Sequence, residues 1–294
     1  MAKTDANRSL GISLRPGRPE DASELGRICL EAFNSISSKH GYPCDFPSVE
    51  AAVEGLGRLL SNPKFYSVVA EHDGKVIGSN FLDERCTITG VGPITVDPTF
   101  QNRDAGRQLM LAVMKRSAEL GAAGIRLVQA AYHTRSLALY TKLGFEPREP
   151  LSNMQGQPPR KGVPGRNVRE AGAADLKDCD ALCESVHGHN RSGALQESMK
   201  SGKALVVEHA GRITGYSTGL AFFAHSVGET NEDIMALISA ADSFGGPGIL
   251  LPSRNGVLLR WCLQNGLRIN QQMTLMTIGM YNEPKGAYLP SILF

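Results

Sequence analysis

The sequence predicts an α/β fold with a mixed β-sheet, because strand and helix patterns alternate along its first half. Two strand patterns are joined by Asp73-Gly74, a dipeptide typical of tight β-hairpins. A long helical pattern then separates two further strands, as expected of a crossover between parallel strands. In addition, blocks of the first half recur in the second half. We therefore expect two tandem domains, each with a central mixed sheet flanked by helices.

Hydrophobic periodicity predicts the elements of the first half in order. We expect strand 12–15, helices 20–36 and 48–60, strands 66–71, 75–83 and 90–97, helix 104–120, strand 125–130, helix 135–143 and a final strand over 145–151. In helix 104–120, Leu109, Val113 and Leu120 recur at helical spacing, which predicts that one face packs on a sheet.

Three blocks of the second half resemble blocks of the first half in the same order. The segment between them, MQGQPPRKGVPGRN, is rich in Pro, Gly and basic residues, as a linker is. We predict an N-terminal copy at 1–153, a linker at 154–167 and a C-terminal copy at 168–294. The matched blocks are 14–29 with 168–183 (a shift of 154), 71–78 with 208–215 (137) and 142–145 with 264–267 (122).

Composition indicates a soluble globular protein: 294 residues, 41% hydrophobic, 20% charged, with a net charge of +2. This near-neutral charge gives no electrostatic reason to expect nucleic acid or an anionic membrane as partner. The start, MAKTDANRSLG, has no apolar run, and no stretch approaches the ~18 apolar residues of a membrane span. We expect a cytoplasmic protein, and the sequence leaves open whether it forms a homodimer.

The cysteines indicate neither a disulfide framework nor a metal site. They form no CxxC pair and no Cys/His cluster with zinc spacing, so we expect reduced, mostly buried thiols and no metal. Cys29 and Cys183 occupy matching positions on the inner face of the first helix of each copy, which favours packing over catalysis. The six are Cys29, Cys44, Cys86, Cys179, Cys183 and Cys262.

Residues 101–107, QNRDAGR, form a polar loop that follows strand 90–97 and opens helix 104–120. The first N–H groups of a helix have no intrahelical partner and lie at the positive end of its dipole. Arg103 and Arg107 add positive charge, and Gly106 has no Cβ to keep a ligand away. The loop therefore predicts an anion site, typically for a phosphate.

This loop resembles the cofactor loop of the GCN5-related N-acetyltransferases (GNAT), whose pattern is Gln/Arg-x-x-Gly-x-Gly/Ala. Gln101 and Gly106 fit the pattern, whereas Asp104 stands where the first glycine is usual. A second family pattern, Tyr-x-x-x-Gly-Phe, matches 140–145, and His133 replaces the asparagine seven residues before the tyrosine. The resemblance implies a splayed sheet in each domain and acetyl-CoA as the acyl donor.

The resemblance also implies which residues bind acetyl-CoA. Backbone groups near Ile94 and Val96 would pair with the pantetheine arm and the thioester. Asp104 has a second interpretation, a helix N-cap with its carboxylate turned outward. His133 either bonds the pantetheine arm or is an ordinary loop residue. The full set is Ile94, Val96, Gln101, Asn102, Arg103, Asp104, Ala105, Gly106, Arg107, His133 and Ser136.

For catalysis, the resemblance implies direct attack of an amine on the thioester, with Tyr140 as general acid. A phenol with a pKa of ~10 can protonate a leaving thiolate; the alternative is a tyrosine packed on a helix face. For the general base we select Glu84, beside Asp83 at the end of strand 75–83. Either carboxylate could equally be only solvated, with water as the base.

The acceptor is expected to be a small-molecule amine. In the family, the segment between the first two helices borders the acceptor site, which here gives Phe33, His40 and Tyr42, with Asn34 and Phe46 nearby. Aromatic side chains with one His suit a small polar molecule that has an apolar part. They suit a hydrophobic lid without a ligand equally well.

The C-terminal copy lacks the features that hold phosphate. Its segment 226–233, SVGETNED, carries three carboxylates and no Arg or Lys, and Cys262 stands at the position of Tyr140. Acidic residues there repel an anionic ligand. We expect a non-catalytic copy that stabilises the protein and shapes the acceptor cleft. The rival functions are a CoA or acyl-CoA sensor with little turnover, and a scaffold.

Overall fold

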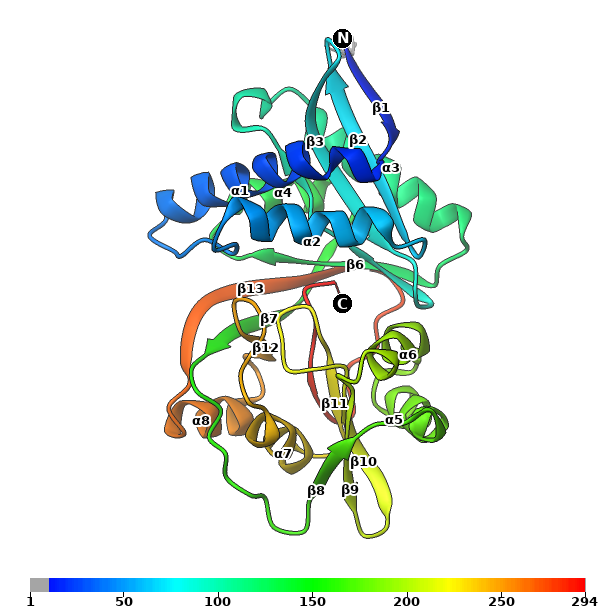
Figure 1. Cartoon of the computed structure of the whole chain (residues 1–294), viewed down its shortest axis with the longest axis vertical. Helices are drawn as coiled ribbons and strands as arrows, with labels where there is room; N and C mark the ends of the chain where they lie inside the picture. The colour runs from blue at the N-terminus through cyan, green and yellow to red at the C-terminus, as the bar shows by residue number, and fades with distance from the viewer. Residues whose placement is uncertain (1–10, 294) are drawn as a thin grey trace, which may run out of the picture. The chain divides into compact units, whose positions relative to one another are not determined.

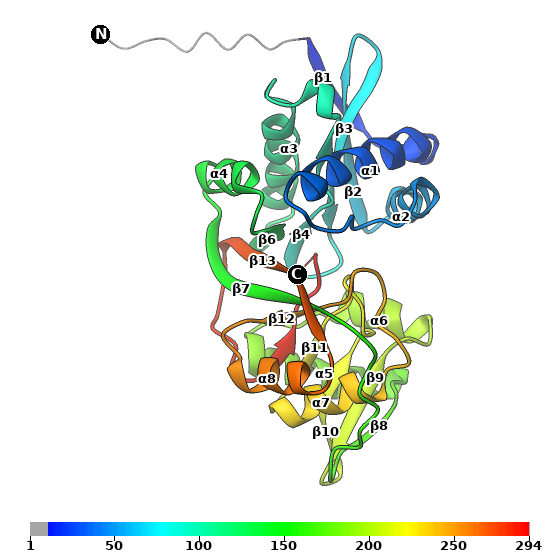
Figure 2. The same cartoon turned by 90° about the vertical axis from the view of Figure 1, so that its left-hand side faces the viewer.

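The computed structural model describes residues 11–293, which fall into two compact units. Of the described residues, the first unit comprises 11–82 and 93–119, and the second comprises 83–92 and 120–293. Figures 1 and 2 show the elements of both units.

The first unit is a small sheet covered by helices on both faces. Its strands lie in the order β1-β2-β3, with β5 paired to β3. In Figure 2, α1 and α2 cover one face of β2 and β3, and α3 covers the other. The strands are β1 Ile12–Pro16, β2 Phe65–His72, β3 Lys75–Asp83 and β5 Thr95–Val96. The helices are α1 Ala22–Lys39, α2 Val49–Ser61, α3 Ala105–Glu119 and the 3-10 turns η1 Pro19–Asp21 and η2 Pro98–Phe100.

Local signals explain these elements. Asp73 and Gly74 have φ values of 50° and 75°, the left-handed pair that a tight hairpin turn requires, so the predicted β2–β3 hairpin is confirmed. The Ser48 hydroxyl accepts a hydrogen bond from the Ala51 N–H and begins α2 as an N-cap. The core of this unit joins α1, α2, β2 and β3 through Leu25, Cys29, Leu56, Val69 and Phe81.

The predicted single strand over 90–97 is wrong, because the structure has two short strands there, β4 (Ile88–Val91) and β5. Gly92 between them has a φ of 135°, which L side chains rarely adopt, and Pro93 has no N–H to give to a ladder. The chain therefore changes direction between the two strands.

The second unit contains two sheets. One runs β4-β6-β13-β7-β12 and the other β14-β11-β10-β9-β8. Strands β4 and β6 are parallel, as predicted for strands joined by a helical crossover, and the remaining pairs are antiparallel. The strands are β6 Gly124–Ala130, β7 Glu146–Gln155, β8 Asn167–Glu170, β9 Leu205–His209, β10 Arg212–Ser217, β11 Ser226–Gly228, β12 Ile249–Pro252, β13 Arg268–Gly279 and β14 Ala287–Leu289. The helices are α4 Thr134–Lys142, α5 Leu176–His187, α6 Ser192–Lys200, α7 Asn231–Ala240, α8 Gly256–Gln264 and the turn η3 Ala173–Asp175.

Strand β13 lies between β6 and β7, and β12 pairs with the other edge of β7 (Figure 2). Two strands of the C-terminal copy thus complete a sheet begun by the N-terminal copy, an arrangement that no sequence pattern predicted. The domain boundary predicted at the linker 154–167 remains a prediction. The sheet contains strands from both sides of this linker.

The second sheet buries both faces, as the alternation of β9 shows. Val206 packs with Cys183 of α5 and Leu195 of α6, whereas Val207 packs with Ile234 of α7. Neighbouring residues of a strand point to opposite faces. Helices α5 and α6 therefore cover one face and α7 the other.

The structure confirms the register of the internal repeat at the level of single ion pairs. Arg15 contacts both Asp21 and Glu71 at 2.7 Å. At shifts of 154 and 137, Arg169 contacts Asp175 at 2.7 Å and Glu208 at 2.8 Å. Each copy therefore joins its first strand to the 3-10 turn before its first helix and to its second strand in the same way.

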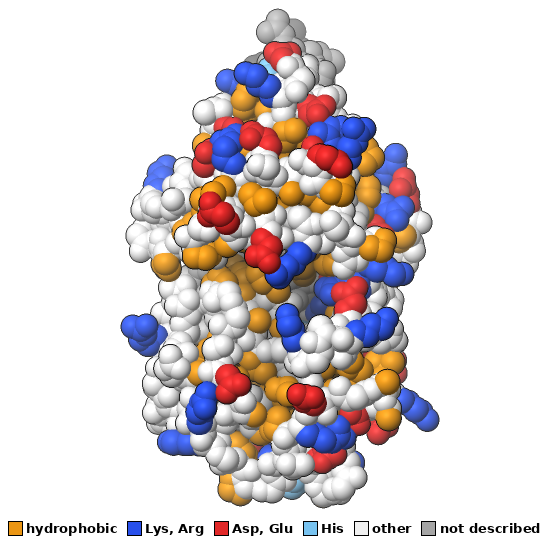
Figure 3. All heavy atoms as spheres, in the orientation of Figure 1, with side chains coloured by type: hydrophobic (Ala, Val, Ile, Leu, Met, Phe, Trp, Pro, Cys, Tyr) orange, Lys and Arg blue, Asp and Glu red, His pale blue; other side chains and the backbone are white. Residues whose placement is uncertain are grey.

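Side chains of both charge signs are mixed over the face shown in Figure 3, in keeping with the near-neutral sequence. All six cysteines are free thiols, and Cys29 and Cys183 are buried in the cores of their copies, as predicted. Burial raises the pKa of Cys183 to about 11, so this thiol is protonated at neutral pH. Among residues 11–293, no helix is long and apolar enough to cross a membrane, and no His, Cys, Asp and Glu cluster could hold a metal ion.

Candidate active site

The predicted anion loop, residues 101–107, is attached to β5 and opens α3 in the first unit. The Gln101 side-chain amide donates to the Val96 carbonyl over 3.1 Å, which fixes the start of the loop. The Gln108 N–H donates to the Asp104 carbonyl over 3.0 Å and is the first such bond of α3. The N–H groups of Ala105, Gly106 and Arg107 precede this bond, so they are the donors that a helix start offers to an anion.

Asp104 begins α3 in a left-handed conformation, with a φ of 69°. Only glycine adopts this conformation at no steric cost, which explains why a glycine is usual here in the pattern. The Asp104 side chain is 41% exposed, and its Oδ2 lies 4.0 Å from Nη1 of Arg107. The predicted anion loop thus carries a partly exposed carboxylate, which lies close to one of its two arginines.

Asp104→Gly is expected to lower the Kd for CoA about three- to tenfold and to raise the unfolding free energy by up to ~1 kcal/mol. CoA affinity rises because the substitution removes a negative charge near the diphosphate. Repulsion between two like charges is worth about 1 kcal/mol at short range in water. Stability rises because the substitution removes the left-handed strain. Calorimetric titration and thermal unfolding measure the two effects.

Two variants separate charge from strain. Asp104→Asn should tighten CoA binding without the full gain in stability. Asp73→Gly relieves a comparable φ of 50° in the β2–β3 turn and should leave CoA affinity unchanged. Unchanged affinity in both Asp104 variants would show that the Asp104 carboxylate does not face the ligand.

The remaining predicted residues of the first unit belong to this loop or precede it in the chain. Arg103 and Arg107 are both exposed, and the Arg103 guanidinium lies 5.2 Å above the centre of the Phe100 ring. Ile94 lies between β4 and β5, outside both strands, whereas Val96 pairs with Gly78 of β3. A Cβ on Gly78 would lie 2.4 Å from the Thr95 carbonyl oxygen, so glycine is required for β5 to approach β3.

In the second unit, His133, Ser136 and Tyr140 recur at helical spacing along α4 and lie on one face. His133 occupies the N-cap position, and the Ser136 Oγ lies 2.8 Å from the His133 carbonyl and 3.0 Å from Gln129 Oε1. Tyr140 is 7% exposed and packs edge-on against Phe145, with ring centres 6.3 Å apart. Burial raises the pKa of Tyr140, so the phenol keeps its proton through the neutral range.

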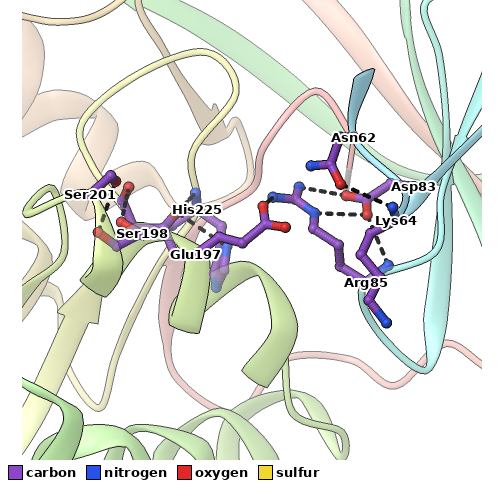
Figure 4. Close-up of polar contacts among 9 residues, drawn as sticks. Asn62, Lys64, Asp83, Arg85, Glu197, Ser198, Ser201 and His225 are labelled. Carbon is purple, nitrogen blue, oxygen red and sulfur yellow. Dashed lines mark hydrogen bonds and ion pairs between the residues drawn. The ribbon is translucent and has the colours of Figure 1, made fainter. Parts of the chain in front are cut away.

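The predicted base lies on the turn between β3 and β4. Asp83, the last residue of β3, is buried, and its carboxylate receives the Arg85 backbone N–H (3.0 Å), Nε (2.8 Å) and Nη2 (2.6 Å). Arg85 Nη1 also donates to Glu197 of α6 over 2.8 Å (Figure 4). Asp83 is therefore committed to the ion pair, and Glu84 is the partly exposed carboxylate beside it.

The predicted acceptor residues lie at and after the end of α1 in the first unit. Phe33 and Phe46 face each other with ring centres 6.1 Å apart and pack on the core of this unit. His40 is exposed, and the His40 and Tyr42 N–H groups both donate to the Ser37 carbonyl, at 3.0 and 2.9 Å. The two phenylalanines therefore pack against the hydrophobic core, and His40 and Tyr42 belong to a tight turn.

In the C-terminal copy the start of the corresponding helix, α7, carries a buried carboxylate that is bonded to donors of the protein itself. Asp233, which is 0% exposed, accepts bonds from the Thr230 N–H and hydroxyl at 2.9 Å, from Thr214 at 2.7 Å and from Arg166 at 2.6 Å. The acidic residues of this segment therefore do more than repel an anion, because one of them caps α7. Strand β11 pairs with β10 on one edge and with β14 on the other.

Two features of the C-terminal copy escaped the sequence analysis. Strand β14 is only three residues long, too short to leave a periodic signal. Asn255 lies 122 residues after His133, at the position where the family pattern has asparagine. Its Oδ1 accepts the Leu258 N–H over 3.2 Å, and its Nδ2 donates to Asn231 over 2.7 Å. The repeat shift of 122 could have identified Asn255.

This chain is similar to known acetyltransferases in sequence and in fold. The profile of the acetyltransferase (GNAT) domain matches residues 63–147. A mycothiol acetyltransferase of Nocardia farcinica is 38% identical over 143 residues, which cover 47% of this chain and 46% of that protein. The match thus spans about half the length of this curated relative.

Three solved structures resemble nearly the whole chain. An acetyltransferase of Pyrococcus horikoshii has a TM-score of 0.73 at 16% identity and covers 94% of both chains. A GCN5-related N-acetyltransferase of Sphaerobacter thermophilus has a TM-score of 0.61 at 15% identity, covering 92% of this chain and 96% of that chain. A tandem GNAT protein from the clavulanic acid biosynthesis pathway has a TM-score of 0.56 at 13% identity, covering 91% and 98%. At these identities the likeness shows the fold alone.

Proposed function

We propose that this chain, whose residues 63–147 match the acetyltransferase (GNAT) domain, is an N-acetyltransferase that moves the acetyl group of acetyl-CoA to the amine of a small molecule. The loop at the start of α3 carries this proposal. It offers helix N–H groups between two exposed arginines, within the residues that match the family profile. The name of the Nocardia relative supports a small-molecule acceptor.

In this proposal the residues of the N-terminal copy divide the work of binding. The N–H groups of Ala105, Gly106 and Arg107 hold the diphosphate, together with the Arg103 charge. Backbone groups at Ile94 and Val96 pair with the pantetheine arm and polarise the thioester carbonyl. The break between β4 and β5 fits this role, because Ile94 lies outside both strands.

The reaction then needs two proton transfers. The amine nitrogen attacks the thioester carbon, a C–N bond forms, and the C–S bond breaks. Tyr140 gives its phenolic proton to the departing sulfur, for which burial has kept the phenol protonated. Glu84, directly or through water, takes the proton that the amine nitrogen loses. A cytoplasmic location with reduced thiols stays part of this proposal.

We assign a supporting role to the C-terminal copy. Asp233 places a carboxylate in the first turn of α7, which disfavours a phosphate there, and β14 pairs with the edge of β11, so that strand edge is already occupied. The copy contributes two strands to the sheet that contains β6 and β7.

A CoA titration with two charge reversals tests the proposal. Arg103→Glu is expected to weaken CoA binding about 10- to 100-fold, because a charge-assisted contact worth ~1.5–3 kcal/mol becomes a repulsion. Arg212→Glu is the matched control, since Arg212 is an exposed arginine of the C-terminal copy that pairs with Glu229. Equal losses would show that the wrong copy has been assigned, and no binding at millimolar CoA would refute the proposal.

The rival function is a CoA sensor, which the carboxylate of Asp104 beside the anion loop favours. Both functions predict thermal stabilisation by acetyl-CoA, about 2.7 kcal/mol at 100 times its Kd. Release of free thiol on mixing with a panel of amines separates them. Thermal stabilisation by acetyl-CoA without release of thiol would support the sensor function.

A further inference from the structure

The turn that carries Glu84 is built around Arg85. The Arg85 side chain folds back on the Asp83 carboxylate through Nε and Nη2, at 2.8 and 2.6 Å, while its backbone N–H donates to the same carboxylate. Three bonds to one carboxylate fix the backbone on both sides of Glu84. The position of Glu84 therefore depends on Arg85.

Helix α6 of the C-terminal copy contacts Arg85 at two points. A Cβ on Gly193 would lie only 2.1 Å from the Arg85 carbonyl oxygen, so the first turn of α6 lies directly on the backbone of this turn. One helical turn later, Glu197 Oε2 accepts Nη1 of Arg85 over 2.8 Å (Figure 4). Residues four apart lie on the same helix face. The same face of α6 thus contacts both the backbone and the guanidinium of Arg85.

These contacts hold Arg85 as a charged residue in a poorly solvated place. Burial opposes the charged form, but hydrogen bonds and charge from Asp83 and Glu197 raise the pKa of Arg85 overall. Two carboxylates share one guanidinium, two of whose hydrogen bonds go to Asp83 and one to Glu197, and loss of either carboxylate weakens the compensation of a partly buried charge.

We infer that α6 of the C-terminal copy positions Glu84 for acetyl transfer in the N-terminal copy, with Gly193 and Glu197 as positioning residues. The inference rests on the proposed function. A base must lie within hydrogen-bond reach of the proton that it takes, and a displacement of about 1 Å can cost about 10²-fold in rate. The C-terminal copy therefore acts on turnover without touching either substrate.

Glu197→Gln is expected to lower kcat about 10- to 100-fold and to leave the KM for acetyl-CoA within about twofold. Glu208→Gln is the matched control. It removes an ion pair of the same length, 2.8 Å, and similar exposure, 35% against 40%, elsewhere in the C-terminal copy. Glu197→Asp keeps the charge and should restore part of the lost kcat.

A double mutant distinguishes positioning from a general structural role. If Glu197 acts through Glu84, then Glu84→Gln with Glu197→Gln is no slower than Glu84→Gln alone. Gly193→Ala, which forces α6 away from Arg85, should reproduce the loss, whereas Gly172→Ala has room for its Cβ and should not. Fully additive losses, an unchanged kcat, or an equal loss in Glu208→Gln would overturn the inference.

The same assays separate this inference from the proposed function. If the wild type transfers acetyl groups and Glu84→Gln does so at the same rate, the positioning role is refuted and the proposed acetyltransferase function is not. Absence of acetyl transfer by the wild type refutes the proposed function and takes the positioning role with it.

Discussion

Tyr140→Phe is expected to lower kcat about 10²–10⁴-fold while the Kd for acetyl-CoA stays within a few-fold. The substitution removes only the hydroxyl, and Tyr140 packs as a buried aromatic residue that phenylalanine can replace. Steady-state kinetics with an amine acceptor and a CoA titration measure the two quantities.

The pH profile gives an independent check of this role. Burial raises the pKa of Tyr140, so the phenol stays protonated up to and above the ordinary value of ~10. Turnover that depends on this proton is therefore retained as pH rises and is lost only above that value. The loss at high pH should be absent in Tyr140→Phe.

Tyr216→Phe is the control for the loss of a buried phenol. Tyr216 is fully buried in the C-terminal copy and bonds His225 over 3.0 Å, so this variant should lose stability without losing turnover. A large loss of acetyl-CoA affinity in Tyr140→Phe would instead identify Tyr140 as a binding residue. Unchanged turnover would mean that another group protonates the thiolate.

Asp233→Ala is expected to destabilise the fold by about 3–5 kcal/mol, because it leaves Arg166 without its carboxylate and the start of α7 without its cap. Asp233 is fully buried and Arg166 nearly so, so water compensates little of the loss. Chemical or thermal unfolding measures the effect, and each kcal/mol lowers Tm by about 2–4 °C in a domain of this size.

Glu232→Ala is the matched control, since Glu232 is an exposed carboxylate on the same first turn of α7. It should cost less than about 0.5 kcal/mol. If Asp233→Ala were equally mild, the network around Asp233 would be unimportant for stability.

The sequence predicted those parts of the fold that depend on neighbouring residues. The Asp73-Gly74 hairpin and the parallel pair β4 and β6 follow from turn chemistry and crossover length. Leu109 and Val113 of α3 are buried as their periodicity predicts, whereas the prediction for Leu120 is wrong, because Leu120 lies beyond the end of α3 and is 44% exposed. The repeat register also came from short blocks, and the Arg15 and Arg169 ion pairs confirm it.

Non-local pairing was beyond the sequence. Nothing in residues 268–279 states that β13 will lie between β6 and β7, because any strand with the right faces can fill that place. The break at Gly92-Pro93 could have been predicted, because proline cannot donate a hydrogen bond to a β-ladder. The strand propensity of the residues on both sides favoured one continuous strand instead.

The candidate site divides in the same way. Contiguous patterns identified the loop 101–107 and Tyr140, whose roles remain proposals. The left-handed φ of Asp104 is visible only in the folded backbone. The Arg85–Glu197 pair joins residues 112 positions apart and could not be derived from spacing.

The place of β13 has a consequence for how the protein is made. A ribosome releases β6 and β7 well before it synthesises residues 268–279, so both strands first emerge with an open edge. Open edges invite pairing with other chains, and late non-local pairing is slow. The sheet that contains β6 and β7 is therefore completed only after residues 268–279 have been synthesised, and its open edges are exposed to other chains until then.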